Sequence, residues 1–407
     1  MNCRHCSAEL QHTFLDLGYA PPSNAYLKES DLNVPERYYP LRLKVCAQCW
    51  LVQTEDFACA SELFSDEYAY FSSTSSSWLR HAAEYSEQII RRLALNRESF
   101  VIEIAANDGY LLRNFMDAGI PCLGIEPTSS TAAAAEKMGI PVIREFFGEA
   151  MGIRLAESGR TADLIAGNNV FAHVPDINDF ARGLKAVLKP AGTITLEFPH
   201  LMQLIQHAQF DTVYHEHFSY LSLLSVDRIL RSAGLRIADV EELSTHGGSL
   251  RVYACHESDP RKDSPMVHAI LDRERRFGLN DLSVYLEFQK RIDGIKHGLM
   301  TFLIERKRAG CSIGGYGAAA KGNTLLNYAG IKPDLLPFVC DAAPSKQWRY
   351  LPGSHIPVLP PAALKEHKPG FVLILPWNIA DEIRTDHSYI RDWGGRFVTA
   401  VPEIQVV

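Results

Sequence analysis

Two pairs of cysteines near the start of the chain have the spacing of metal ligands. Cys3 and Cys6 form one Cys-x-x-Cys pair, Cys46 and Cys49 form a second, and 39 residues separate the two pairs. Two such pairs can supply four thiolates in a tetrahedron, and this soft ligand set selects zinc. Because four protein ligands leave no open coordination position, we expect the zinc to stabilise the fold and to take no part in chemistry.

A second group of residues that could take part in catalysis or metal binding is the run Tyr214, His215, Glu216 and His217. Two histidines around an acid favour either a metal site or general acid–base catalysis. The histidines lack the i, i+4 spacing of the helical zinc motif, which favours acid–base catalysis over metal binding. Isolated histidines are usually structural, so the position of this run relative to a cofactor site decides its role.

A turn of small residues between two apolar runs, 100–104 and 122–125, indicates a nucleoside site. Small side chains let the backbone approach a ligand, and an acid after the second strand binds ribose hydroxyls. The turn begins with an acid, so it is closer to the Glu/Asp-x-Gly-x-Gly turn of S-adenosylmethionine (SAM) methyltransferases than to Gly-x-Gly-x-x-Gly. A plain structural crossover is the alternative. The residues expected to contact the cofactor are Glu103, Ala105, Asn107, Gly109 and Glu126.

A comparable turn lies in the C-terminal part of the chain. Gly315, Gly317 and Ala320 match a dinucleotide fingerprint, and Asp341 lies where a ribose-binding acid would. From the residues alone, this region could hold NAD, cradle another phosphate ligand with backbone amides and Lys321, or serve as a scaffold. The three alternatives stay open because a fold does not name its ligand.

The elements that position the central residues alternate between strand and helix patterns. Strands are expected at 100–104, 122–125, 141–143, from 163, and at 192–198, with helices at 110–116, 132–138, 180–188 and 226–233. A glycine pair joins two further strands, 235–242 and 249–255, into a hairpin. Five βα units closed by an antiparallel hairpin are typical of a class I SAM methyltransferase sheet. Asn169 and His173 follow the fourth strand, so we expect them at the rim where α/β sheets place chemistry.

The predicted fold class is α/β in three parts. These are a small zinc-ribbon module at 1–70, a central class I SAM methyltransferase domain with a Rossmann-like sheet at 71–256, and a C-terminal Rossmann-like domain at 257–407. Residues 257–310 are predicted to form a helical, charged connector, with 273–276 and 305–308 on solvated faces. Tyr68 follows the zinc module in a stretch with linker or binding-loop composition.

Composition excludes several functional classes. The chain has 407 residues, 46% hydrophobic and 22% charged, with a net charge of −7 and no basic run, so nucleic acid is not an expected partner. No apolar stretch approaches membrane-spanning length and no signal-peptide core is present, so a cytoplasmic protein is expected. Nine cysteines in such a chain favour metal binding or free thiols over a disulfide framework.

The order of these parts resembles one family along nearly the whole chain. It is the family of SAM-dependent C-methyltransferases of deoxysugar biosynthesis, especially the nucleotide-sugar C-3-methyltransferases. The most specific matches are the paired Cys-x-x-Cys motifs, Tyr-His-Glu-His at 214–217, and Gly-Tyr-Gly-Ala-Ala-Ala-Lys-Gly-Asn-Thr at 315–324. The cofactor turn departs from the family, because Ala and Asn replace two of its usual glycines.

The resemblance implies a substrate, two cofactors and a set of site residues. The substrate would be a 4-keto-6-deoxy sugar on a nucleoside diphosphate, the cofactors SAM and structural Zn²⁺, and the C-terminal domain would grip the nucleotide diphosphate. A monomer or weak dimer is expected. By resemblance, the catalytic residues are Tyr214, Glu216 and His217, and the substrate-binding residues are Tyr68, Asn169, His173, Lys321 and Asn323.

These roles suggest a mechanism in which a ketone acidifies the neighbouring carbon. We expect His217 to remove the C3 proton, Glu216 to orient it or stabilise its imidazolium, and the resulting enolate carbon to take the methyl group from SAM. An NAD-dependent oxidoreductase or epimerase is the main rival, although no Tyr-x-x-x-Lys pair accompanies the C-terminal turn. A zinc-ribbon partner protein that binds a nucleotide without catalysis is a second rival. Transfer to another carbon, or to oxygen or nitrogen, is a third possibility.

Overall fold

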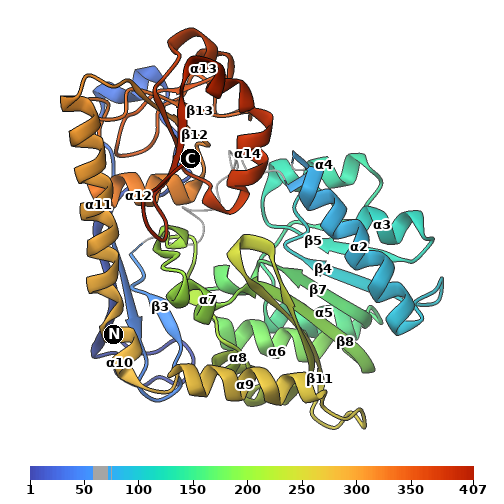
Figure 1. Cartoon of the computed structure of the whole chain (residues 1–407). Coiled ribbons are helices and arrows are strands. Elements are labelled where there is room, and N and C mark those ends of the chain that lie inside the picture. The colour runs from blue at the N-terminus through green and yellow to red at the C-terminus, as the bar shows by residue number, and fades with distance from the viewer. Residues whose placement is uncertain (58–71, 75) are drawn as a thin grey trace.

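The computed structural model describes residues 1–57, 72–74 and 76–407 and contains three β-sheets (Figure 1). A four-stranded sheet lies in the N-terminal module, a seven-stranded sheet in the central domain, and a six-stranded sheet in the C-terminal domain. No helix among the described residues is both long and apolar enough to cross a membrane. Tyr68 lies outside the described residues.

The central sheet has the predicted topology. Its strand order is β10-β11-β8-β7-β4-β5-β6, with β4 to β8 parallel and β11 antiparallel to both of its neighbours. The strands are β4 (Val101–Ile104), β5 (Cys122–Ile125), β6 (Val142–Ile143), β7 (Ala162–Asn168), β8 (Leu188–Pro199), β10 (Leu235–Leu243) and β11 (Ser249–His256). All four residues of β4 and of β5 are buried, as expected for parallel strands covered on both faces.

Helices cover the central sheet and connect its strands. They are α2 (Ser76–Leu93), α3 (Leu112–Asp117), α4 (Ser129–Lys137), α5 (Glu149–Glu157), α6 (Ile177–Val187) and α8 (Leu223–Ser232), while α7 (Leu201–Gln206) lies in the insertion between β8 and α8. Asp176 begins α6 by accepting the amide hydrogen of Asp179, and Ser222 does the same for Ser225 in α8. Such side chains satisfy backbone donors that a helix start leaves free.

The C-terminal domain is an open, mainly parallel sheet in the order β14-β13-β12-β15-β16-β17. Its elements are β12 (Ile313–Tyr316), α12 (Ala320–Ala329), β13 (Val339–Cys340), β14 (Val358–Leu359), α13 (Ala362–His367), β15 (Phe371–Ile374), α14 (Ala380–Asp386), β16 (Arg396–Thr399) and β17 (Gln405–Val406). Only β17 is antiparallel to its neighbour. The predicted Rossmann-like arrangement is therefore present.

The N-terminal module packs into both larger domains. Its sheet combines β1 (His12–Ala20), β2 (Tyr39–Val45) and β3 (Val52–Thr54) with β9 (Ser219–Tyr220), which the central insertion supplies directly after 214–217. The module also shares a hydrophobic core with the C-terminal domain. Because the cores are shared, the boundaries at 70 and 256 remain predictions.

The segment 257–310 is helical as predicted, but it is more than a connector. It forms α9 (Pro265–Phe277), α10 (Leu282–Leu286) and α11 (Phe288–Arg308). Figure 1 shows α11 running beside the N-terminal strands, and its Phe288 ring stacks on Phe14 with centroids 4.9 Å apart. Ile292, Leu299 and Leu303 are fully buried in the same core.

The prediction of a solvated face at 273–276 is wrong at Glu274. This side chain is 0% exposed. Its carboxylate accepts hydrogen bonds from the backbone amides of Leu223 and Leu224 at 2.7 and 2.8 Å, and pairs with His200 Nε2 at 2.7 Å. Glu274 therefore holds the amino terminus of α8, which explains why a charge is tolerated in the core.

Short 3-10 helices complete the described chain. They are η1 (Glu29–Asn33), η2 (Ser72–Thr74), η3 (Phe171–His173), η4 (Phe210–Thr212), η5 (Thr245–Gly247), η6 (Trp377–Ile379) and η7 (Ser388–Trp393). Four of them (η3, η4, η5 and η6) border the candidate functional site.

Candidate functional site

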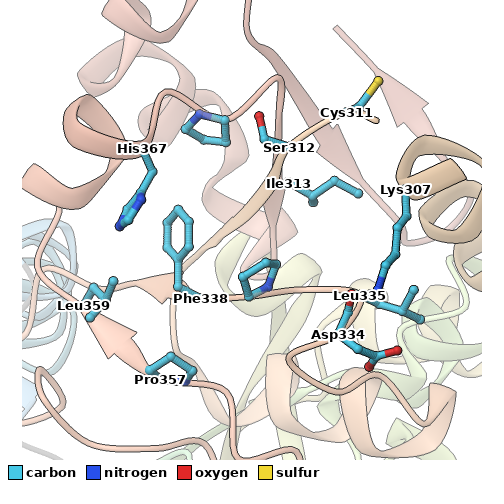
Figure 2. A pocket seen from close by; sticks show the side chains of 12 residues that line it. Lys307, Cys311, Ser312, Ile313, Asp334, Leu335, Phe338, Pro357, Leu359 and His367 are labelled. Carbon is cyan, nitrogen blue, oxygen red and sulfur yellow. Dashed lines mark hydrogen bonds between the residues drawn. The ribbon is translucent and has the colours of Figure 1, made fainter. Parts of the chain in front are cut away.

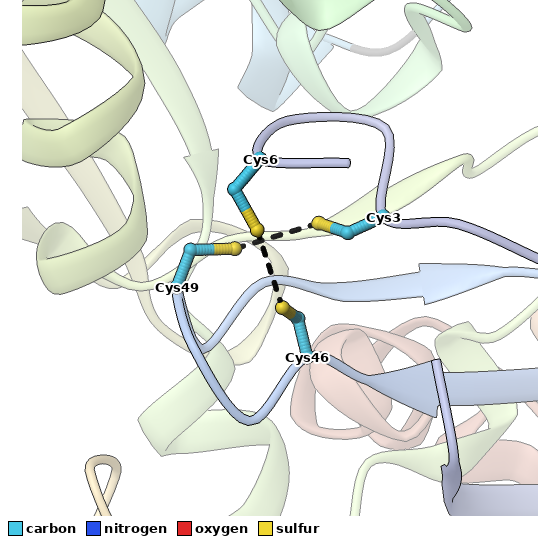
Figure 3. A group of neighbouring side chains, drawn as sticks. All are labelled: Cys3, Cys6, Cys46 and Cys49. Atoms are coloured by element: carbon cyan, nitrogen blue, oxygen red, sulfur yellow. Dashed lines mark hydrogen bonds between the residues drawn. The ribbon is translucent and has the colours of Figure 1, made fainter. Parts of the chain in front are cut away.

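The four predicted zinc ligands converge on one point (Figure 3). Cys3 Sγ lies 3.4 Å from Cys49 Sγ, Cys6 Sγ lies 3.5 Å from Cys46 Sγ, and all four sulfurs are within 4.8 Å of one another. A tetrahedral zinc with Zn–S bonds of 2.3 Å separates its sulfurs by about 3.8 Å. The four thiolates therefore fit one zinc ion with no position left for a substrate.

The predicted cofactor turn adopts a strained backbone. Ala105, Asn107 and Gly109 have φ values of 58°, 49° and 80°, so two non-glycine residues take the left-handed conformation that glycine adopts in the family's turn. Glu126 closes the turn, because its carboxylate accepts hydrogen bonds from the amides of Asn107 and Thr128, both at 2.9 Å. The missing glycines therefore change the sequence pattern without preventing the left-handed turn.

Glu103 is a buried acidic residue at the start of this turn. It is 1% exposed, and neither carboxylate oxygen has a hydrogen-bond partner within the part of the chain that the structure describes. Burial, and then the nearby carboxylates of Glu126 and Asp108, raise its pKa well above its usual value. A ligand that brings cationic or hydroxyl groups to this end of β4 would satisfy both oxygens, and SAM carries both kinds of group.

The side-chain rings of three predicted site residues, Tyr214, His173 and His217, lie next to one another beside the central sheet. The His217 ring lies 4.0 Å from that of Tyr214 and 4.5 Å from that of His173, centroid to centroid. His217 Nδ1 is 3.2 Å from the carbonyl oxygen of Thr212. A carbonyl can only accept, so Nδ1 carries the proton and Nε2 carries the free lone pair. Nε2 has no hydrogen-bond partner among the described residues.

Burial keeps these histidines neutral. The pKa of His217 is lowered well below 6.5, mainly by burial and then by His173. The pKa of His173 is lowered to about 4, again by burial, against a hydrogen bond from its Nδ1 to the carbonyl of Glu216. A neutral imidazole with a free lone pair is the form that a general base requires.

Glu216 contacts the N-terminal module. Its carboxylate accepts hydrogen bonds from Asn24 Nδ2 at 2.9 and 3.1 Å, whereas His217 is oriented by Thr212. The printed contacts of Glu216 thus lead to the N-terminal module, and its predicted role toward His217 stays a prediction. His215 is buried, and its Nε2 lies 3.3 Å from the carbonyl oxygen of Tyr39 in the N-terminal module.

The remaining predicted substrate residues lie in two different surroundings. Asn169 directly follows β7 in a left-handed conformation, φ 54°, and its Nδ2 lies 3.4 Å from His246 Nε2. Lys321, in the first turn of α12, donates to Asn378 Oδ1 at 2.6 Å and lies over the Trp377 ring. Asn323 is 1% exposed and donates to the carbonyl of Ser23 at 2.6 Å, a contact between domains.

Sequence reasoning missed three residues at this site. Asn24 reaches Glu216 across 192 positions, and Trp377 Nε1 donates to the buried Asp211 Oδ2 at 2.7 Å across 166 positions. Such contacts leave no local pattern. His246 did have a signal, since it precedes the glycine pair of the predicted hairpin, but nothing in the sequence brings it to Asn169.

A cavity of about 450 Å³ lies elsewhere in the C-terminal domain (Figure 2). It is lined by Ser312, Ile313, Phe338 and Pro369, which lie at the amino ends of the parallel strands. Lys321 and Trp377 follow the carboxyl ends of β12 and β15, at the opposite edge of the same sheet. The cavity is therefore separate from the candidate site.

Comparisons with known proteins agree with this geometry. Three family models match: a zinc binding domain over residues 3–64, a methyltransferase domain over 78–240, and a C-methyltransferase C-terminal domain over 244–402. C-methyltransferase NovU of Streptomyces niveus is 32% identical over 405 residues, covering 100% of this chain and 96% of that protein. The chain belongs to the C-methyltransferase family. The family resemblance, the α/β fold class with a zinc module, and the expected enzyme class are therefore confirmed.

Two more distant similarities were found. An uncharacterized methyltransferase of Mycobacterium leprae is 28% identical over 98 residues, covering 24% of this chain and 36% of that protein. The solved structure of the glycopeptide N-methyltransferase MtfA with SAM has a TM-score of 0.35 and 14% identity, covering 43% of this chain and 94% of that one. As a C-methyltransferase, the protein uses SAM as its methyl donor, and its cysteine cluster is the zinc-binding element of its family.

Proposed function

We propose that this C-methyltransferase adds a methyl group to C3 of a 4-keto-6-deoxy sugar carried on a nucleoside diphosphate. The observation that carries the proposal is the tautomer of His217, whose Nδ1 hydrogen bond to Thr212 leaves Nε2 as a neutral, partner-free base. Methylation of a carbon requires a carbanion equivalent, and a base beside an activated C–H bond supplies one. The sugar itself comes from the family resemblance described above.

The proton and electron balance is simple. His217 Nε2 takes the C3 proton, and the electron pair of the C–H bond moves toward the C4 ketone to give an enolate. When bound, SAM supplies the methyl group to that nucleophilic carbon, and the C–S electron pair stays on sulfur. A positioned general base contributes on the order of 10²- to 10⁴-fold to the rate.

Hydrogen-bond donors near His217 would stabilise the enolate oxygen. Tyr214 lies within ring contact of His217, and Asn169 follows the neighbouring strand β7, so these two are the proposed donors. The Nδ1 proton of the neutral His173 is directed at the carbonyl of Glu216, so Nε2 of His173 is proposed to accept a hydrogen bond from a sugar hydroxyl. A preorganised donor at such an oxygen is typically worth about 3 kcal/mol. Tyr68, whose structure is not described, keeps its proposed substrate role on the resemblance alone.

The nucleotide diphosphate is proposed to bind at the carboxyl edge of the C-terminal sheet. Lys321 lies there at the start of α12, where backbone amides and a cationic side chain suit a phosphate. Asn323 keeps its proposed place in the substrate site by resemblance; its Nδ2 donates to the carbonyl of Ser23, while its buried Oδ1 has no hydrogen-bond partner among the described residues. The alternative function, an NAD-dependent oxidoreductase or epimerase, predicts instead that the turn at 315–320 binds NAD and that the protein has redox activity without SAM.

The test uses purified protein, SAM and a panel of 4-keto nucleotide sugars in deuterated buffer. In the His217→Asn variant the amide nitrogen can still donate to Thr212, but the base is lost. We expect this variant to lose both methyl transfer and solvent exchange at C3. Exchange at the rate of the unsubstituted protein would overturn the assignment of the base. His268→Ala, an exposed histidine on α9, is the control and should behave as the unsubstituted protein.

A further inference from the structure

His246 lies at the candidate site in a conformation that its residue type does not favour. It has φ 54° and ψ 20° in the turn between β10 and β11, directly before Gly247 and Gly248. The left-handed conformation is sterically unfavourable for a residue with a Cβ atom, whereas glycine adopts it readily. Strained non-glycine residues of this kind concentrate at functional sites, so the side chain itself requires an explanation.

The turn around His246 is anchored on both sides. Thr245 Oγ1 donates to Glu197 at 3.1 Å, and the carbonyl of Gly247 accepts from Gln209 Nε2 at 2.8 Å. There is also no room for a side chain after His246, since a Cβ on Gly247 would lie 2.6 Å from the Trp377 ring. The backbone of the turn on either side of His246 is therefore held by the central domain, the insertion and the C-terminal domain together.

The hydrogen bond to Asn169 defines the tautomer of His246. Asn169 Nδ2, which can only donate, lies 3.4 Å from His246 Nε2. Nε2 therefore accepts, and the ring proton is on Nδ1, which has no hydrogen-bond partner among the described residues. Trp78 lies against the ring, with centroids 5.4 Å apart. His246 as a residue is half-buried and not sealed in the core, and we infer from the missing partner of Nδ1 that a ligand group can occupy this position.

The two histidines are complementary in function. His217 offers a free lone pair, and His246 offers a free N–H from the neighbouring hairpin. Burial, and then Lys321, lower the pKa of His246 to about 4, so the ring is neutral when it donates. Neutral imidazoles serve as electrophiles beside carbonyl groups that are being enolised in other enzymes.

We propose that His246 is a further catalytic residue, which donates a hydrogen bond from Nδ1 to the ketone oxygen of the substrate while His217 removes the adjacent proton. The inference rests on the function proposed above. No bond to His246 forms or breaks; its N–H stabilises the negative charge that moves onto oxygen. The proton abstracted by His217 is a different one, so the two rings do not compete.

His246→Gly separates this role from a structural one. Glycine adopts the left-handed turn without strain, so the variant should fold with an unchanged or higher melting temperature and bind SAM with unchanged affinity. Methyl transfer and C3 exchange should both fall about 10²- to 10³-fold. Added imidazole should restore part of both rates, because the lost ring leaves space for it. His268→Ala serves as the control.

Each outcome decides between the two proposals. If the unsubstituted protein methylates the sugar and His246→Gly does so at the same rate, this inference fails and the proposed function stands. A variant that keeps full C3 exchange but loses methyl transfer also overturns the inference, because the ketone oxygen would then need no donor from His246. If the unsubstituted protein acts on no 4-keto sugar of the panel, the proposed function fails, and the inference fails with it.

Discussion

Gly109 provides a stringent test of how tightly the cofactor turn is built. Its φ is +80°, and an added Cβ would lie 2.4 Å from Ile140 Cδ1 and 3.1 Å from Ala135 Cβ. Gly139, which follows helix α4, has φ +85°, but no heavy atom of the described residues lies within 4 Å of the equivalent Cβ position. Alanine at each of the two positions therefore separates backbone strain from steric overlap.

The magnitudes follow from these two environments. A left-handed alanine costs about 1–2 kcal/mol, so Gly139→Ala should lower the free energy of unfolding by that amount. At Gly109 the overlap adds about 1–3 kcal/mol, since an overpacked core relaxes only partly. Ile140 is 1% exposed and cannot turn into solvent. Gly109→Ala should therefore lower the free energy of unfolding by about 2–5 kcal/mol.

Urea unfolding of both variants and titration with SAM provide the measurements. A shifted turn would move the Asn107 amide away from Glu126, so Gly109→Ala should also weaken SAM binding about tenfold or more, equivalent to about 1.4 kcal/mol. Gly139→Ala should bind SAM normally. Equal destabilisation of the two variants, within about 0.5 kcal/mol, would refute the packing argument. Normal SAM affinity of Gly109→Ala would refute the assignment of this turn to the cofactor.

Three further predictions concern the zinc site, the base and the N-terminal module. Cys46→Ser should lower the zinc content measured by elemental analysis and lower the melting temperature, and full metal occupancy would contradict the four-thiolate site. The pKa of His217 is lowered, so the base is neutral above that pKa and protonated below it. The decrease of kcat/KM toward acidic pH should therefore have its midpoint below pH 6.5. A midpoint above pH 7 would exclude His217 as the base. By resemblance Glu216 is one of the catalytic residues, so Asn24→Ala, which removes two hydrogen bonds to Glu216, should lower kcat/KM for the sugar about tenfold with SAM affinity unchanged. Unchanged kcat/KM, or a loss of SAM affinity alone, would contradict this role of Glu216.

The central sheet could be predicted because its signals are local. Strands buried on both faces are apolar runs, and the glycine pair at 247–248 marks the hairpin between β10 and β11. Spacing alone also identified the zinc ligands. Where the expected glycines were absent, at Ala105 and Asn107, the backbone still adopts the left-handed conformation, because surrounding contacts such as Glu126 to the Asn107 amide hold it.

The rest of the site could not be read from local patterns, because it is made by contacts between distant segments. β9 completes the N-terminal sheet from more than 150 positions away, and Asn24 meets Glu216 only when that sheet forms. The charged stretch at 273–276 led to a wrong prediction for the same reason. Glu274 has the surroundings of a solvated helix face in sequence, yet it binds the free amides of α8, a partner that periodicity does not show.

These long-range contacts divide the proposed reaction between two bodies. The proposed SAM turn belongs to the central sheet, whereas the segment carrying the proposed base is held from two sides. Thr324 Oγ1 of the C-terminal domain donates to the carbonyl of Val213 at 2.7 Å and Trp377 donates to Asp211, while Asn24 and β3 of the N-terminal module hold Glu216 and β9. Trp377 also packs on Gly247, next to His246. A sugar nucleotide held by the C-terminal domain would therefore be fixed relative to both histidines. In the proposed mechanism, the position of the C-terminal domain would therefore set the placement of the sugar for both proton removal and methyl transfer.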